Sequence, residues 1–144
     1  MSERLNVVFD TQIFLRALIN RKSVCARISD VPLRGHYTLF ISDAIEAEIE
    51  DVFSRPKVRT KFSWITDEFI AETWHSLRDE AQRVEVEVVE PVSRDHKDDI
   101  FLACAKAAKA DYLISEDNDL LVLEHYGSTS IINAFEFLAI LENR

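Results

Sequence analysis

Glycine and cysteine are scarce in this sequence, with two of each among 144 residues. A dinucleotide-binding fingerprint or a P-loop needs several closely spaced glycines, which Gly35 and Gly127 cannot supply, so both motifs are excluded. Cys25 and Cys104 lack the CxxC spacing and lie in apolar helical stretches, so we expect two reduced, buried thiols in a cytoplasmic protein. No apolar run approaches the ~20 residues of a membrane span. Residues 1–4 lead directly into a predicted strand, so we expect no signal peptide.

Basic residues are also few, with 17 Lys and Arg against 26 Asp and Glu, for a net charge of −9. This sign argues against strong nonspecific binding to nucleic acid, so any contact with RNA must be local. It also suits a basic protein partner. Because 47% of the residues are hydrophobic and no linker or repeat divides the chain, we expect one globular domain over residues 1–144.

Strand and helix patterns alternate along the chain, which predicts an α/β fold around a mostly parallel sheet of five strands. Residues 84–88 alternate valine and glutamate, which is typical of a half-exposed strand at a sheet edge. Ser42, Thr66 and Asn133 are suited to cap helices. The expected strands are 5–9, 38–41, 84–88, 112–115 and 130–132, and the expected helices are 11–19, 24–29, 43–54, 66–83, 100–109, 118–123 and one starting at 133.

Four acidic residues are predicted to lie where a strand ends or a helix begins. Asp10 follows the first strand, Asp117 follows the fourth, Glu48 lies on the helix after the second, and Asp99 opens the helix before the fourth. In an open parallel sheet, ligands bind outside the carboxyl ends of the strands, so we expect these carboxylates to meet in one pocket. Two carboxylates about 5 Å apart repel by roughly 3 kcal/mol at an effective dielectric near 20, so such a cluster needs a cation.

Each of the four acids also has a structural interpretation. Asp10 and Asp99 suit helix N-termini, Glu48 flanks an apolar helix face, and Asp117 lies in a polar turn. As a set they offer only oxygen ligands, with no paired histidine or thiolate, which favours Mg²⁺ or Mn²⁺. The leading hypothesis is therefore metal-assisted cleavage of a phosphodiester, with these four residues as catalytic metal ligands.

Neighbouring residues complete the predicted site. Asp119 is a further candidate metal ligand, because it shares the direction of Ser115 and Asp117 if the turn is extended. Asp98 projects about 100° away from Asp99 on a helix, so we expect it to support the ligands rather than to bind the metal. Ser115 is placed to orient water or phosphate.

The run 55–61 carries four basic residues directly after the Glu48 helix: Arg55, Lys57, Arg59 and Lys61. Two interpretations stay open. These residues guide RNA phosphates toward the metal, or they form a solvated loop that balances the acidic helix before it. Trp64 and Trp74 are expected to pack within a two-helix arm around this run.

Together these motifs resemble the PIN-domain family, in its branch of toxin components of bacterial and archaeal toxin–antitoxin systems. Residues 7–12, VVFDTQ, resemble the family's opening V-hydrophobic-D-T-N, and residues 42–57 resemble the branch's S-x-x-I-x-x-E helix, which assigns its acid to Glu48. Residues 98–103 are similar to its D-D-x-F-L segment, and residues 110–121 to A-D-Y-L-V-T-x-D-x-D-L-L. The resemblance covers almost the whole chain.

The resemblance implies a three-layer α/β/α sandwich and a metal-dependent ribonuclease that cuts single-stranded RNA or loops. It also implies an antitoxin protein that covers the pocket. Thr11 and Gln12 then lie beside the metal or the substrate, but Gln12 stands where the family has asparagine, so its longer side chain shifts any hydrogen bond to Asp10. The apolar helices allow a homodimer, and no membrane contact is expected.

Two other interpretations use the same residues. In the first, the pocket is catalytically weak or inactive, and the chain is a PIN-like binding module that pairs with a partner protein. In the second, the chain is a phosphoacceptor receiver domain, which also gathers acids at strand ends. That class needs a lysine late in the chain, and no lysine follows Lys109, so it is disfavoured.

Overall fold

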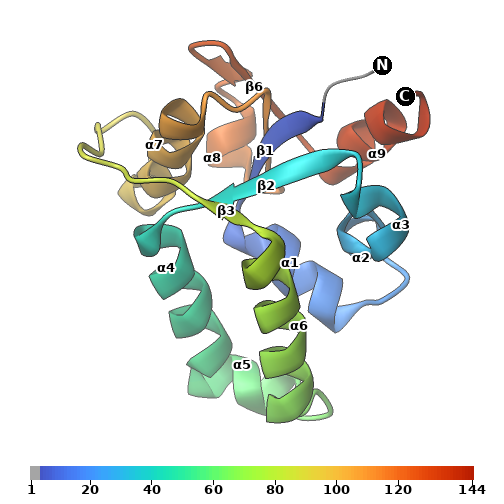
Figure 1. Ribbon diagram of the computed structural model, residues 1–144. Coiled ribbons are helices and arrows are strands. Elements are labelled where there is room, and N and C mark those ends of the chain that lie inside the picture. The colour runs from blue at the N-terminus through green and yellow to red at the C-terminus, as the bar shows by residue number, and fades with distance from the viewer. Residues whose placement is uncertain (1–3) are drawn as a thin grey trace.

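The computed structural model describes residues 4–144 and is built around a sheet in the strand order β3-β2-β1-β4-β6-β5 (Figure 1). Neighbouring strands are parallel except β5 and β6, which are antiparallel. The strands are β1 (Leu5–Phe9), β2 (Tyr37–Ile41), β3 (Gln82–Arg83), β4 (Tyr112–Ile114), β5 (His125–Tyr126) and β6 (Thr129–Ile132). Residues 1–3, on which the expectation of no signal peptide partly depends, lie outside the described residues.

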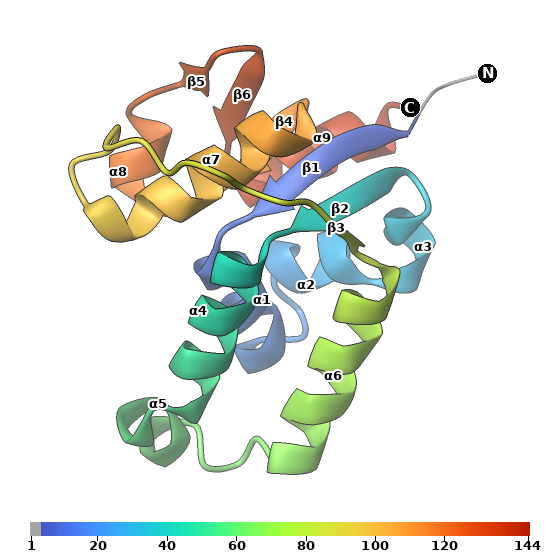
Figure 2. The ribbon, with the colours of Figure 1, turned by 60° about the vertical axis from the view of Figure 1, so that its left-hand side comes forward.

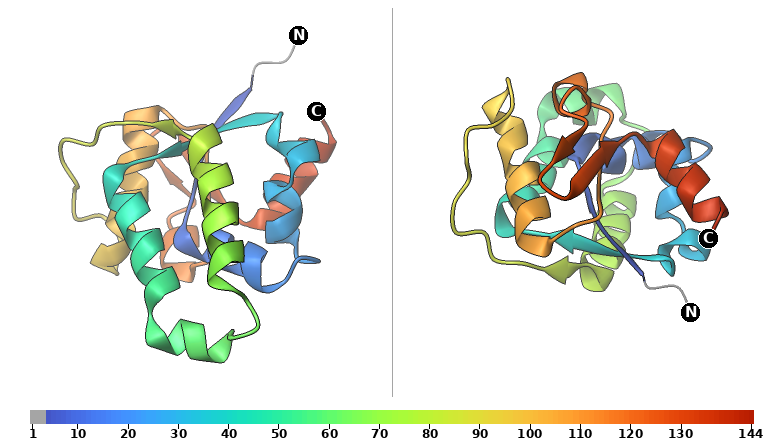
Figure 3. Two further views of the ribbon diagram at one scale, coloured as in Figure 1. Left: turned by 60° about the horizontal axis from the view of Figure 1, so that its bottom comes forward. Right: turned by 90° about the horizontal axis from the view of Figure 1, so that it is seen from above.

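Helices cover both faces of the sheet (Figure 3). On one face α7 packs against β1, β2 and β4, and on the other α2 packs against α1 and α9. The predicted α/β fold with a mostly parallel sheet is confirmed, although the sheet has six strands instead of five. The helices are α1 (Thr11–Ile19), α2 (Val24–Ser29), α3 (Val31–Arg34), α4 (Asp43–Ser54), α5 (Pro56–Lys61), α6 (Asp67–Glu80), α7 (Asp99–Ala108), α8 (Asn118–Leu121) and α9 (Ala134–Glu142), with a 3₁₀ turn η1 (His96–Asp98).

The helices α4, α5 and α6 form an arm that projects from the sheet, with α5 at its tip (Figures 1 and 2). Ser42 begins the arm by accepting a hydrogen bond from the Ile45 amide at 3.3 Å. Pro56 disfavours helical geometry at Arg55 and so ends α4. It then occupies the first turn of α5, where its missing N–H costs nothing. The basic run 55–61 is therefore helical from Pro56 onward and not a loop.

The predicted edge strand 84–88 is wrong in its position. Only Gln82 and Arg83 pair with β2, and the ladder ends with a 2.9 Å hydrogen bond from the Val84 amide to the Ile41 carbonyl. Beyond Ile41 the neighbouring chain turns into α4, so residues 85–88 have no partner strand. Their burial alternates only as far as Glu87, because Val86 is half-buried between exposed Glu85 and Glu87 while Val88 is 72% exposed.

Aromatic rings hold the helices to the sheet. Phe137 of α9 contacts Phe9, Tyr37 and Tyr112 from three strands, with ring centroids 5.4–6.3 Å apart. Trp74 of α6 packs edge-on against Phe14 at 5.9 Å, which ties the arm to α1. Trp64, by contrast, is 63% exposed, so the expectation that it packs within the arm is wrong. It lies in the turn after α5, where its ring is 6.4 Å from the Phe62 ring, centroid to centroid.

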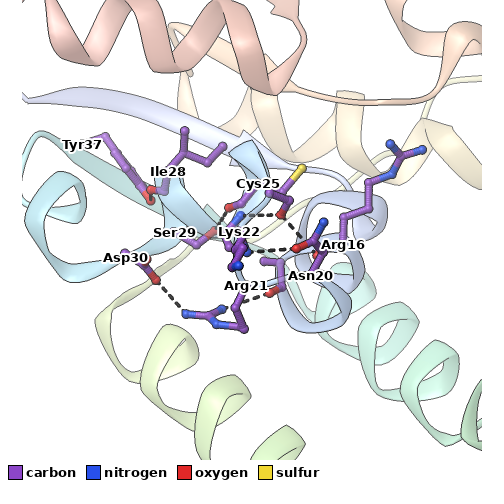
Figure 4. Close-up of polar contacts among 12 residues, drawn as sticks. Arg16, Asn20, Arg21, Lys22, Cys25, Ile28, Ser29, Asp30 and Tyr37 are labelled. Atoms are coloured by element: carbon purple, nitrogen blue, oxygen red, sulfur yellow. Dashed lines mark hydrogen bonds and ion pairs between the residues drawn. The ribbon is translucent and has the colours of Figure 1, made fainter. Parts of the chain in front are cut away.

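Local hydrogen bonds fix the helix ends. Asn133 and Glu136 form the predicted capping box at the start of α9, with bonds of 2.8 and 3.2 Å. The corner between α1 and α2 is closed by an ion pair between Arg21 and Asp30 at 2.8 Å (Figure 4). Tyr37 donates its hydroxyl proton to the Ile28 carbonyl at 2.6 Å and so joins this corner to β2.

Both cysteines are free and buried, as predicted. Burial raises the pKa of each thiol to about 12, so neither is a ready nucleophile or metal ligand. Within residues 4–144, no helix is long and apolar enough to cross a bilayer.

Phe137→Ala is expected to lower the free energy of unfolding by about 3–5 kcal/mol, because it leaves a cavity among packed rings. Urea unfolding followed by circular dichroism measures this loss. The control is Phe135→Ala on the same helix, where the ring is 69% exposed and the change should stay within about 0.5 kcal/mol. Equal losses in the two variants would contradict this description of the core.

Candidate metal centre

The site is built where the two central strands end. β1 and β4 are in parallel register with Phe9 beside Ile114, and the Asp10 amide donates to the Ile114 carbonyl at 3.1 Å. This pairing brings Asp10, the residue after β1, next to Ser115, the residue after β4. Both residues therefore lie at the carboxyl ends of parallel strands, where open α/β sheets bind their ligands.

The Asp10 carboxylate is buried and held on both oxygens. Oδ1 accepts from the Ile13 amide at 3.1 Å and so caps α1. Oδ2 accepts from Ser115 Oγ at 2.5 Å and from the Glu116 amide at 3.3 Å. Burial raises the pKa of Asp10 to about 6 even though these hydrogen bonds favour the ionised form.

Asp98 is the second buried acid of the site. It ends η1 immediately before α7, and its Oδ2 has no hydrogen-bond partner among the described residues. Burial raises the pKa of Asp98 to about 7, and nearby Asp117 adds to the rise, followed by Asp95 and Asp10. Asp117 lies near Asp10, because the Asp117 amide donates to Ser115 Oγ at 2.9 Å and Ser115 donates to Asp10 Oδ2.

The acid cluster continues toward solvent. Asp95, Asp98 and Asp119 each offer one carboxylate oxygen, and these three atoms lie within 4.8 Å of one another. Asp117 caps α8 by accepting from the Asp119 amide at 2.8 Å. Arg94 Nη2 lies 2.8 Å from Asp119 Oδ1, so a cation already approaches the mouth of the cluster.

Asp99 is placed differently from our prediction. Its Oδ1 accepts from the Val92 amide at 3.2 Å, the Ser93 amide at 2.7 Å and Ser93 Oγ at 2.8 Å. Its Oδ2 lies 3.2 Å from His96 Nδ1. Burial raises the pKa of Asp99, but the hydrogen bonds from Ser93, then from His96 and Val92, outweigh it and lower the pKa below its ordinary value.

The expected places of Asp98 and Asp99 are therefore reversed, since Asp98 faces the cluster and Asp99 binds the loop before α7. The 100° rotation that we assumed holds inside an α-helix, whereas Asp98 belongs to a tighter 3₁₀ turn. Metal binding by any of these residues stays a prediction. The sequence analysis did not identify three residues beside the cluster: Ser93, Arg94 and Asp95. The signal in the sequence that could have pointed to Asp95 is its spacing of three residues from Asp98.

Three other residues of the predicted site make fewer contacts with the clustered acids: Glu48, Gln12 and Thr11. Glu48 is half-buried on α4, and its carboxylate lies 3.9 Å from Arg55 Nη2. Among residues 4–144, neither the hydrogen bonds of Asp10 nor the cluster of Asp95, Asp98 and Asp119 includes Glu48. Gln12 is exposed on α1, whereas Thr11 is buried and its Oγ1 has no partner in the described part of the chain.

The predicted basic residues lie at the tip of the arm, on and next to α5. This helix is at the end of α4 that points away from α7 and α8 (Figure 2). Arg55 Nη2 lies 2.8 Å from Asp51, and Arg59 pairs with Asp67. Lys57 is exposed and has no ion pair within the described residues. The basic run is thus partly neutralised, and its remaining charge is separated from the acids.

The donor set fits a hard divalent cation. All of its atoms are carboxylate or hydroxyl oxygens, both cysteines lie outside it, and buried Asp98 Oδ2 is an acceptor without a donor. Mg²⁺ and Mn²⁺ prefer such oxygen ligands, and binding of either ion would satisfy the unpaired atom.

Known proteins share the fold of this chain. The family model for the PIN domain matches residues 6–119. A chain in the crystal structure of VapBC2 from Rickettsia felis, bound to a DNA fragment from their promoter, is similar with a TM-score of 0.62 and 12% identity, over 90% of this chain and 98% of that one. PAE2754 from Pyrobaculum aerophilum is similar with a TM-score of 0.54 and 13% identity, over 98% of this chain and 91% of that one. A comparison with curated sequences gives no match. Because the family model covers most of the chain, including every strand of the site and its acid cluster, this chain belongs to the PIN-domain family.

Proposed function

We propose that this chain is a Mg²⁺- or Mn²⁺-dependent endoribonuclease that acts as the toxin of a toxin–antitoxin pair. The observation that carries the proposal is buried Asp98 Oδ2, which has no hydrogen-bond partner among the described residues and is surrounded by other carboxylates. An unpaired buried charge is costly, and a divalent cation between Asp98, Asp10 and Asp117 removes that cost. Membership of the PIN-domain family supports nuclease chemistry.

The residues of the chain divide the work of binding and orienting. Ser115 and the Ile13 amide fix the rotation of the Asp10 carboxylate, so that its free lone pairs keep one direction. Asp98 and Asp117 complete the inner ligand set, while Asp119 extends it toward solvent. When bound, the metal supplies positive charge at the phosphodiester and a more acidic water for attack on phosphorus.

The proposed substrate is single-stranded RNA or an RNA loop, in keeping with the resemblance to PIN-domain toxins. Exposed Gln12, two residues after Asp10, would contact the chain of nucleotides entering the site, whereas buried Thr11 would support the metal ligands from within the fold. Lys57 at the tip of the arm, with Arg55 and Arg59 beside it, would contact phosphates farther along. We further propose that an antitoxin protein covers the acid cluster, that the chain works in the cytoplasm as one domain, and that it can form a homodimer.

A protein-binding module without catalysis is the second candidate. It is favoured by a cavity of about 300 Å³ between the arm and α1, lined by Phe14, Leu18, Trp74 and Leu77 and containing none of the clustered acids. In this candidate the cavity receives a partner and the acids are a remnant. Mn²⁺ titration separates the two, because an intact site stabilises the folded chain as the ion binds.

Asp98→Asn and Asp10→Asn are each expected to reduce Mn²⁺-dependent RNA cleavage by about 100-fold or more, because metal catalysis contributes several kcal/mol. A fluorescent single-stranded RNA and gel analysis of its products measure the rate. The matched control is Asp111→Asn, which alters an exposed carboxylate bonded to the Asn6 amide at the opposite ends of the strands. Full activity in Asp98→Asn would reject the assignment.

Without metal, Asp10→Asn is expected to gain stability over the natural protein as pH rises from 5 to 8, by about 1–1.5 kcal/mol. The Asp10 carboxyl has a pKa near 6 when folded and 3.8 as its ordinary value, so the folded state binds more protons in this window. Raising the pH therefore removes stability from the natural protein and not from the variant. Thermal unfolding in EDTA measures the difference, and adding Mn²⁺ should abolish it. A difference that does not change with pH would contradict the raised pKa.

Lys57→Ala should weaken RNA binding and flatten its salt dependence by about 0.7 log units per log of salt, the value for one phosphate contact on a single strand. Arg59→Ala should have a smaller effect, because Arg59 already pairs with Asp67. Fluorescence anisotropy over a series of KCl concentrations gives both slopes. Lys22→Ala, at an exposed lysine on the α1–α2 turn, is the control. An unchanged slope for Lys57→Ala would favour a role for the run in helix solvation alone.

A further inference from the structure

Among the described residues, the hydrogen-bond partners of the buried Asp99 carboxylate all come from the segment 92–96, directly before α7. Three donors from Val92 and Ser93 reach Oδ1 at 2.7–3.2 Å, and His96 lies 3.2 Å from Oδ2. Asp99 is 3% exposed, and the ring of His96 is largely open to solvent, so the buried anion is compensated almost entirely from residues 92 and 93. Removing the Asp99 charge would therefore weaken the hydrogen bonds that hold this loop, while the hydrogen bonds of the sheet would remain.

The loop that Asp99 holds delivers residues to the acid cluster. Ser93 Oγ lies 2.8 Å from Asp99 Oδ1 and 2.5 Å from the Asp95 carbonyl oxygen, and its single proton serves one of them at a time. The Asp98 amide donates to the same Asp95 carbonyl at 2.9 Å. Asp99 holds Ser93 through the Ser93 amide, so the hydroxyl proton of Ser93 can go to the Asp95 carbonyl, which also accepts from the Asp98 amide. The Asp95 carboxylate joins those of Asp98 and Asp119.

We propose that Asp99 is a positioning residue for the cation site, which acts through Ser93 to hold Asp95 within ligand distance of Asp98 and Asp119. This inference rests on the proposed function, because it assumes that the cluster binds a divalent cation. A carboxylate that orients a ligand-bearing loop typically changes metal affinity by 10–100-fold when it is removed. A simpler role for Asp99, as a negative charge in the first turn of α7, would stabilise the helix without changing the affinity for metal.

The test compares Mn²⁺ affinity in five variants by electron paramagnetic resonance of free Mn²⁺. Asp99→Asn and the milder Ser93→Ala are expected to raise the Mn²⁺ dissociation constant by about 10-fold or more. Asp95→Asn should also weaken binding. Since Asp99 acts through Asp95, the double variant Asp95→Asn/Asp99→Asn should bind no more weakly than Asp95→Asn alone. Asp111→Asn, which removes a carboxylate from a different backbone amide, should bind as the natural protein does.

A second measurement tests the hydrogen bonds between Asp99 and the loop independently of metal binding. Hydrogen exchange of the Val92 and Ser93 amides, in the metal-free protein, should accelerate in Asp99→Asn, because these amides lose a charged acceptor. Natural protein that binds no Mn²⁺ would overturn the proposed function, whatever the exchange rates. Normal Mn²⁺ affinity in both Asp99→Asn and Ser93→Ala, or additive losses in the double variant, would overturn the positioning role while leaving the proposed function in place.

Discussion

The hydrogen bond from Ser115 Oγ to Asp10 Oδ2 joins the ends of the two central strands, and the acid cluster depends on it. It exists because β1 and β4 pair in one register, with Phe9 opposite Ile114. A slip of one strand by one residue would turn its side chains to the other face of the sheet, so that Asp10 and Ser115 would no longer face each other. The buried contact between the Phe9 and Phe137 rings helps to fix that register. Packing in the core therefore determines where the Asp10 carboxylate lies.

Local patterns in the sequence were sufficient for most of the fold. The helix caps at Ser42 and Asn133 and the break at Pro56 follow from residues that interact with their own neighbours, and the parallel sheet follows from the alternation of strand and helix patterns. The errors fall where distant partners decide. The strand at 84–88 fails because β2 ends at Ile41, and Trp64, in the turn after α5, stays largely exposed.

The same distinction applies to the site. Asp10 and Asp117 could be predicted because they follow strands directly, and their convergence needs only parallel pairing. The choice between Asp98 and Asp99 could not, because it depends on a 3₁₀ turn and on the donors of residues 92 and 93. Asp95 could not be predicted as part of the cluster for the same reason. A charge pattern identifies which acids are available, whereas the loops that carry them decide which ones face one another.

The long sequence separation of Asp10 and Ser115 has a consequence for biosynthesis. The two residues are 105 positions apart, so the amino-terminal strand is made long before its partner leaves the ribosome. A growing polypeptide that ends before β4 holds Asp10 without Ser115, Asp117 or Asp119. The cluster of acids can therefore assemble only after β4 and the residues that follow it have left the ribosome, and until then the growing polypeptide holds an incomplete set of carboxylates.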